Sequence, residues 1–151
     1  MLSKRDIVVL VFLGLLAAAT ALLQSYQSQP LAPHDQAIRQ TIGQQINAFQ
    51  RRDKVAAWAL ATPQLQQRFS NPDVFMAMVD GHYEAIVQAH KFTFEAIAKR
   101  ADQGGDMRVQ KVFLTDQRGQ GFFATYLMQK QPDGSWKIAG CQLLKSTALD
   151  I

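Results

Sequence analysis

The stretch KFTFEAIAKRADQGGDMRVQKVFLTDQRGQGFFATYLMQKQPDGSWKIAGCQLLK, residues 91–145, decides the fold of this chain. Apolar and polar side chains alternate in four runs along it, and a period of two is typical of β-strands. Three short segments, 102–105, 117–121 and 132–134, separate the runs. All contain glycine, and two also contain aspartate, a composition that is typical of turns. The stretch therefore predicts four strands in succession, joined by hairpin turns into an antiparallel sheet.

Two features of the pattern indicate the shape of this sheet. Met107 and Val109 share one face of the second strand, whereas Val112 and Leu114 lie on the other, which predicts a β-bulge near Gln110. The third strand carries bulky side chains on both faces, which predicts a central strand that is covered on both sides. We therefore expect a curved sheet with its third strand inside.

The residues that precede the sheet, 34–90, carry the signals of helices. Apolar side chains recur at intervals of three or four between Ile38 and Phe49, and Asp35 stands where an N-cap belongs. The chain is thus predicted to be an α+β protein, with N-terminal helices packed on a curved, cone-like, four-stranded antiparallel sheet. Three further helix starts are indicated at Asp53, Thr62-Pro63 and Asn71-Pro72, and Gly81 fits just past the end of the last helix.

An apolar stretch, Ile7–Leu23, precedes the helices and contains 17 residues without a charge. As a helix it would span about 26 Å, close to the ~30 Å hydrocarbon core of a bilayer. Lys4 and Arg5 flank its front end, which favours an N-terminus on the cytoplasmic side. We expect a membrane helix in residues 7–23, with the rest of the chain across the membrane.

The alternative for this segment is a cleaved signal peptide, with Ala19-Thr20-Ala21 as its small-x-small cleavage site. Both readings give the same organisation of the chain. Residues 1–23 are the anchor or signal, 24–33 are an extended tether, and 34–147 form a single domain.

Charge and cysteine content exclude two classes of protein. The net charge of +4 comes from scattered basic residues with no run of five or more, so no nucleic-acid surface is predicted. Cys141 is the only cysteine in the sequence and therefore forms no disulfide within the chain. Its position in a predicted strand indicates a buried structural thiol.

The helical and closing segments together resemble a known family. They include Ala57–Ala61, Phe75–Val79 followed by Gly81 and Tyr83, and above all the closing Asp133–Cys141 (DGSWKIAGC). The remaining matching positions are Ile38–Phe49, Asp53 and Phe69. Over about residues 36–147 the chain is similar to an uncharacterised family of small bacterial domains within the nuclear-transport-factor-2-like, or cystatin-like, superfamily. The resemblance implies a cone fold with a pocket between sheet and helices, and it implies no particular reaction.

Polar residues near the predicted pocket are the candidates for catalysis. Asp80 and His82 stand at one helix end, and related cone-shaped enzymes resemble one another in placing such residues in an apolar pocket. Glu95 and Tyr126 are expected on the concave face of the sheet, where a buried carboxylate can act as a base. Capping, solvation or a cross-strand ion pair explains the same residues without catalysis.

No cofactor or metal is predicted. The three histidines and Cys141 lack the spacing of a metal site, and no glycine-rich turn opens a helix in the way that phosphate binding requires. Tyr83, Tyr126 and Trp136 are the residues expected to contact a ligand.

These observations predict a non-catalytic, membrane-tethered domain in the bacterial periplasm, anchored in the inner membrane, that binds a small apolar ligand or a partner protein. Secretion to the periplasm after signal cleavage is the alternative location. A proton-transfer enzyme, an isomerase or hydro-lyase with Asp80, His82 or Glu95 as base, is the first alternative function. A homodimer made by packing two sheets face to face is the second.

Overall fold

The computed structural model describes residues 31–100 and 106–147. The described residues from Pro33 onward belong to one compact unit, and the fold given below is the fold of this unit. The stretch Ile7–Leu23, expected to cross or enter a membrane, lies outside the described residues, as does the turn at 102–105. Within the described part, no helix is both long and apolar enough to span a bilayer.

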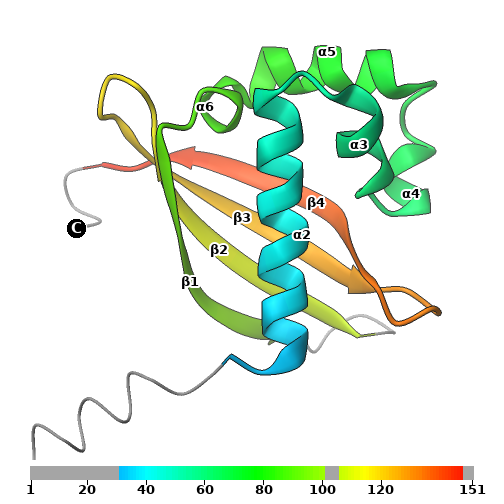
Figure 1. Cartoon of the computed structure of the whole chain (residues 1–151). Helices are drawn as coiled ribbons and strands as arrows, with labels where there is room; N and C mark the ends of the chain where they lie inside the picture. The colour runs from blue at the N-terminus through cyan, green and yellow to red at the C-terminus, as the bar shows by residue number, and fades with distance from the viewer. Residues whose placement is uncertain (1–30, 101–105, 148–151) are drawn as a thin grey trace, which may run out of the picture. The chain divides into compact units, whose positions relative to one another are not determined.

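Among the described residues, five helices precede a four-stranded antiparallel sheet whose strands follow one another in chain order (Figure 1). This confirms an α+β fold with helices packed on an open antiparallel sheet. The helices are α2 (Pro33–Gln50), α3 (Lys54–Ala59), α4 (Pro63–Gln66), α5 (Pro72–His82) and α6 (Glu84–Val87). The strands are β1 (Lys91–Arg100), β2 (Met107–Thr115), β3 (Gly121–Lys130) and β4 (Trp136–Lys145).

The predicted helix starts are confirmed by their capping bonds. The side chains of Asp53, Thr62 and Asn71 each accept a hydrogen bond from the backbone N–H three residues later, at 3.0, 3.2 and 3.0 Å. Proline follows directly after two of these caps, where its missing N–H costs nothing. Local chemistry therefore fixes where α3, α4 and α5 begin.

Two predicted helix boundaries are wrong by a few residues. α2 begins at Pro33, so Asp35 lies in its first turn, where it pairs with His34 and a negative charge suits the helix dipole. α5 continues through Gly81 and ends at His82, with Tyr83 as the C-cap. Gly81 keeps helical geometry because the Tyr83 N–H still bonds to the Val79 carbonyl at 2.8 Å.

The first β-bulge lies in β1, and the predicted bulge at Gln110 is wrong. Glu95 and Ala96 of β1 stand opposite Lys111 of β2, whereas β2 pairs with β3 without interruption. The sequence pattern misled because Gln110, a polar residue, is fully buried on the same face as Val112. There it supports the bulge, since its amide nitrogen donates to the Glu95 carbonyl at 2.8 Å.

The helices cover one face of the sheet, which is called the inner face here. α2 runs along this face, and α3 to α6 gather near one end of α2 (Figure 1). In β3, Ala124, Tyr126 and Met128 point inward and are buried, while Phe123 and Leu127 on the outer face are half-buried. β3 is central as predicted, but the described helices cover it on one side only, because the domain has two layers.

The free edge of β4 is held by the chain segment between α3 and α4. The Ile138 N–H donates to the Leu60 carbonyl, and the Thr62 N–H donates to the Ile138 carbonyl, both at 2.9 Å. Just beyond this contact, Ala139 forms a second bulge, because Leu127 and Met128 of β3 pair with Gly140 and Ile138. The edge strand β4 is thus held by two backbone hydrogen bonds at Ile138, and its pairing with β3 is interrupted by the bulge immediately after this residue.

Two glycines offer opposite tests of the packing. A Cβ added at Gly43 in α2 meets no atom within 4 Å, whereas one added at Gly121 lies 3.0 Å from the Phe113 ring. We expect Gly43→Ala to raise the free energy of unfolding by about 1 kcal/mol through helix propensity. Gly121→Ala should lower it by about 1–3 kcal/mol, because the ring must move. Urea unfolding followed by circular dichroism measures both, and equal shifts would contradict this packing.

Candidate functional site

An apolar pocket of about 210 Å³ lies between the helices and the inner face of β3 and β4. Helices α2, α5 and α6 supply buried residues to its walls, and the turn after α4 supplies residues at its rim. On the β4 side, backbone and side chains of residues 138–141, including the bulge at Ala139, complete the lining. The pocket therefore lies beside the bulge of β4 at Ala139.

Phe49, Phe69 and Phe75 form one wall of the pocket, and Trp58 packs against Phe69 and Phe75 without lining it. Phe75 of α5 is the centre of this aromatic wall, with ring centroids of Trp58, Phe69 and Phe49 at 5.4, 5.5 and 6.1 Å. The Trp58 and Phe69 rings meet Phe75 edge to face, an arrangement that aromatic quadrupoles favour. Such packing makes this wall rigid, so the pocket does not depend on flexible side chains on this side.

Tyr126 of β3 is the most deeply buried polar residue of the lining. Only 1% of its surface is exposed, and its hydroxyl makes no hydrogen bond of ordinary geometry among the described residues, the Cys141 sulfur being a weak acceptor beside it. Burial raises the pKa of this phenol well above its usual value, and the neighbouring Cys141 adds to the effect. The hydroxyl is therefore a neutral donor at physiological pH, and a buried donor without a partner costs about 1–3 kcal/mol.

Cys141 and Tyr83 lie beside Tyr126. Burial raises the pKa of the Cys141 thiol to about 12, with the Tyr126 hydroxyl partly opposing the shift, so the thiol is protonated and unreactive at neutral pH. The Tyr83 hydroxyl donates to the Cys141 carbonyl at 2.8 Å, which ties the junction of α5 and α6 to β4. Burial also raises the pKa of Tyr83. All three groups are consequently uncharged in this region.

Arg68 is the one charged residue among those that line the pocket. It lies in the turn after α4 and is exposed, so it stands at the rim, together with half-buried Leu65 and Met78. Gln45 of the lining is buried, and its amide nitrogen donates to the Ala57 carbonyl at 3.2 Å. The pocket thus combines an apolar interior, a neutral buried donor and a cationic rim.

Of the three residues expected to contact a ligand, two line the pocket. These are Tyr83 and Tyr126, and their binding role stays a prediction. Trp136 lies elsewhere: it is buried in the core at the start of β4, with the Arg108 guanidinium 5.7 Å from its ring centroid. Its carbonyl accepts a bond from the Thr41 hydroxyl at 3.3 Å, so Trp136 joins α2 to the sheet.

The candidate bases at the end of α5 do not enter the pocket. The Asp80 carboxylate is partly exposed and forms an ion pair with Arg52. His82 is exposed and lines shallow surface grooves beside Tyr83 and Glu84. Neighbouring residues on a helix point in different directions, and here both point outward.

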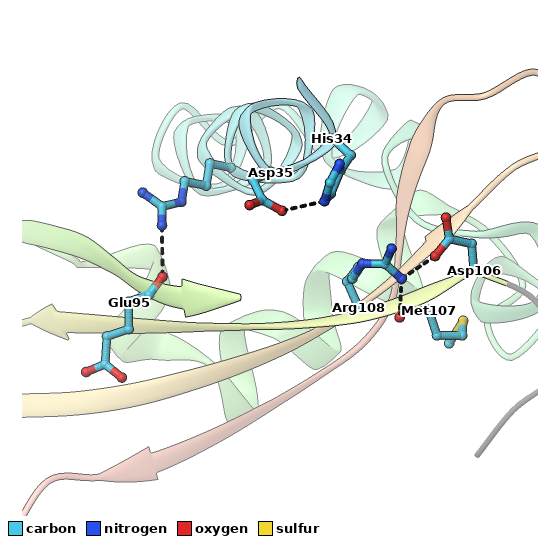
Figure 2. A network of polar contacts seen from close by, with 7 residues as sticks. His34, Asp35, Glu95, Asp106, Met107 and Arg108 are labelled. Atoms are coloured by element: carbon cyan, nitrogen blue, oxygen red, sulfur yellow. Dashed lines mark hydrogen bonds and ion pairs between the residues drawn. The ribbon is translucent and has the colours of Figure 1, made fainter. Parts of the chain in front are cut away.

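Glu95 lies on the opposite face of the sheet from Tyr126, contrary to the expectation that both line the concave face. Because Glu95 is in the bulge of β1, its side chain faces outward, where its carboxylate is 3.9 Å from the Lys111 ammonium. Its carbonyl instead faces α2 and accepts a bond from Arg39 at 3.0 Å, as Figure 2 shows. The three candidate bases therefore do not converge, and the geometry gives no support to proton transfer by them.

The outer face of the sheet is the other apolar surface of the domain. The Phe113 and Phe123 rings contact each other there with centroids 5.2 Å apart, and Leu144 is 56% exposed. The Lys111 ammonium lies 4.2 Å from the Phe123 centroid, so a charged side chain partly shields the aromatic pair.

No group of three or more His, Cys, Asp or Glu within the described ranges is arranged to hold a metal ion. The sequence did not indicate Arg68 or the aromatic wall as parts of a site. Cys141 was interpreted from the sequence as a structural thiol only. Phe75 and Cys141 did belong to the segments that carried the family resemblance. Arg68 had no such signal, because its relation to the pocket depends on the turn after α4.

The fold and pocket define a small α+β domain with an apolar pocket between its two layers, and its sequence family can be stated. A family model described as Domain of unknown function (DUF4864) matches residues 31–151. The chain therefore belongs to this family. Comparisons with curated proteins and with solved structures gave no match.

The Tyr126 hydroxyl allows a test of whether this buried group lowers the stability of the protein. We expect Tyr126→Phe to raise the free energy of unfolding of the ligand-free protein by about 1 kcal/mol, because it keeps the ring and removes a buried donor without a partner. Urea unfolding with Tyr83→Phe as control measures this, since that change breaks the bond to Cys141 and should destabilise. A loss of stability in Tyr126→Phe would show that the hydroxyl has a partner.

Proposed function

We propose that this protein is a ligand-binding domain whose pocket receives a small, mainly apolar molecule. The observation that carries the proposal is the apolar pocket with the buried Tyr126 hydroxyl in its lining, whose one polar neighbour is the weakly accepting Cys141 sulfur. A ligand acceptor atom that reaches this hydroxyl restores the hydrogen bond that the free protein lacks, which favours binding. The uncharged state of Tyr83, Tyr126 and Cys141 suits an apolar molecule.

The volume of the pocket limits the size of the ligand. A water molecule takes about 30 Å³ of liquid volume, so 210 Å³ corresponds to about seven groups of that size. This is less than the ~300–1,000 Å³ of a drug-sized site. The proposed ligand is therefore a short chain or a single ring, not a long lipid.

The family is proposed to belong to the nuclear-transport-factor-2-like superfamily. Helices packed on one face of a bulged antiparallel sheet, with a pocket between the two layers, support this assignment. Within such a fold the pocket is the natural binding site, but the fold alone names no ligand.

The domain is further proposed to work on the periplasmic side of the bacterial inner membrane, tethered through residues 7–23. The support comes from the charge-free stretch Ile7–Leu23 and from Lys4 and Arg5 in front of it. Release after cleavage near Ala21 would place the same domain in the periplasm without a tether.

Pocket occupancy can be tested with 1-hexanol, which has about the required size. We expect it to shift backbone amide resonances of residues 138–141 in the full-length protein, with weaker or no shifts at the outer-face Lys111. Val79→Phe, which adds a ring at a buried position of the lining, should abolish the shifts. Leu65→Trp blocks the rim and serves as a second variant if Val79→Phe does not fold. Val55→Phe, at an exposed position, is the matched control. Unchanged binding in both pocket variants would refute the proposal.

The location can be tested separately with a reporter that is active only after export. We expect β-lactamase fused after residue 147 of the full chain to protect a bacterial host from ampicillin. A chain without residues 7–23 should give no protection. A protected host in both cases, or in neither, would contradict export directed by this segment.

A further inference from the structure

We infer that the ligand of the pocket is an amphipathic monocarboxylate, with its carboxylate at Arg68 and its apolar part inside. This inference rests on the proposed ligand-binding function and names the chemical class of the ligand. It is based on the charged residues around the pocket, where Arg68 has no acidic partner.

Arg68 has no partner in the part of the chain that the structure describes. Its guanidinium makes no hydrogen bond and no ion pair with another described residue, although it lines the pocket. Three other arginines differ: Arg52 pairs with Asp80, Arg108 pairs with Asp106, and Arg39 donates to the Glu95 carbonyl. Arg51 and Arg118 also lack a side-chain partner among the described residues, but neither lines this pocket. An exposed cation without a partner is unremarkable elsewhere on a surface, but this one stands at the opening of an apolar pocket.

The acidic residues of the nearby helix are already neutralised. Asp73 at the start of α5 forms an ion pair with Lys54, and Asp80 near its end forms one with Arg52. No Asp or Glu is among the residues that line the pocket. The rim therefore presents one positive charge, and this charge favours an anionic group on a ligand.

A single arginine above an apolar interior selects a particular kind of anion. The planar guanidinium matches a carboxylate with two parallel hydrogen bonds. A second negative charge would find no second cation among the residues that line the pocket. The geometry therefore points to one carboxylate, held at the rim where water still reaches it, while the apolar part displaces water from the interior.

The position of Tyr126 indicates which group the buried part of the ligand should carry. Arg68 is exposed at the rim, whereas Tyr126 is almost completely buried, so the two polar groups lie at different depths of the pocket. A carboxylate held at Arg68 leaves the Tyr126 hydroxyl to the far end of the molecule. A weak acceptor there, such as a carbonyl or ether oxygen, would complete the buried hydrogen bond.

Three six-carbon probes separate the contribution of the charge from that of the chain. Calorimetric titration of the full-length protein at neutral pH should give a dissociation constant for hexanoate about three- to tenfold lower than that for 1-hexanol. Hexylamine should bind more weakly than 1-hexanol, because its charge repels that of Arg68. Raising the salt concentration should reduce the advantage of hexanoate, since an ion pair at the rim is screened.

Two matched variants identify the residue responsible. Arg68→Gln should remove the preference, making the dissociation constants of hexanoate and 1-hexanol equal, whereas Arg51→Gln, which changes an exposed arginine outside this pocket, should preserve the preference. Equal affinity for hexanoate and 1-hexanol in the native protein would overturn the carboxylate inference and leave the ligand-binding proposal standing. Absence of binding by all three probes would overturn both.

Discussion

The edge of β4 is the constraint on which the rest of the structure depends. An edge strand exposes unpaired backbone groups, and here the described chain satisfies them at two separate places. Leu60 and Thr62 bond to Ile138, and the Tyr83 hydroxyl bonds to the Cys141 carbonyl. Between these two points the strand bulges instead of pairing, and the pocket opens there. The helices are thus fixed to the sheet on both sides of the cavity, which keeps it from closing.

The pocket has a cost in stability that a better-packed core would avoid. The cavity leaves the surrounding side chains without contacts, and Tyr126 buries a hydroxyl without a regular partner. A phenylalanine at this position would fill the same space without that penalty. A protein keeps such a residue when its polar group serves something other than folding, so the cost itself argues for a ligand.

The sequence predicted those parts of the fold that local chemistry determines. Capping residues such as Thr62 and Asn71 mark helix starts because their side chains bond to N–H groups three residues away. The four strands were predicted from the alternation of apolar and polar side chains along the sequence. The bulge did not follow, because the register of β1 depends on its partner strand. This single shift sent the Glu95 side chain outward and removed it from the site for which it was a candidate.

The candidate site could be predicted only in part for the same reason. Tyr83 and Tyr126 lie on elements whose inward faces the pattern identified, and both line the pocket. Asp80 and His82 were candidates because of their chemistry, yet their helix presents them to solvent. Arg68 was not singled out, because nothing in a turn after a four-residue helix indicates a pocket.

The value of Arg68 to a ligand comes from where the other charges are placed. Ion pairs neutralise both acidic residues of α5, and no Asp or Glu lines the pocket, so the positive charge at the rim remains uncompensated within the described chain. An exposed ion pair contributes little to affinity, whereas burial of an apolar chain contributes most of it. In the proposed binding mode the cation would set the orientation of the ligand and discriminate against amines, while the aromatic side chains and Tyr126 would set how tightly it is held.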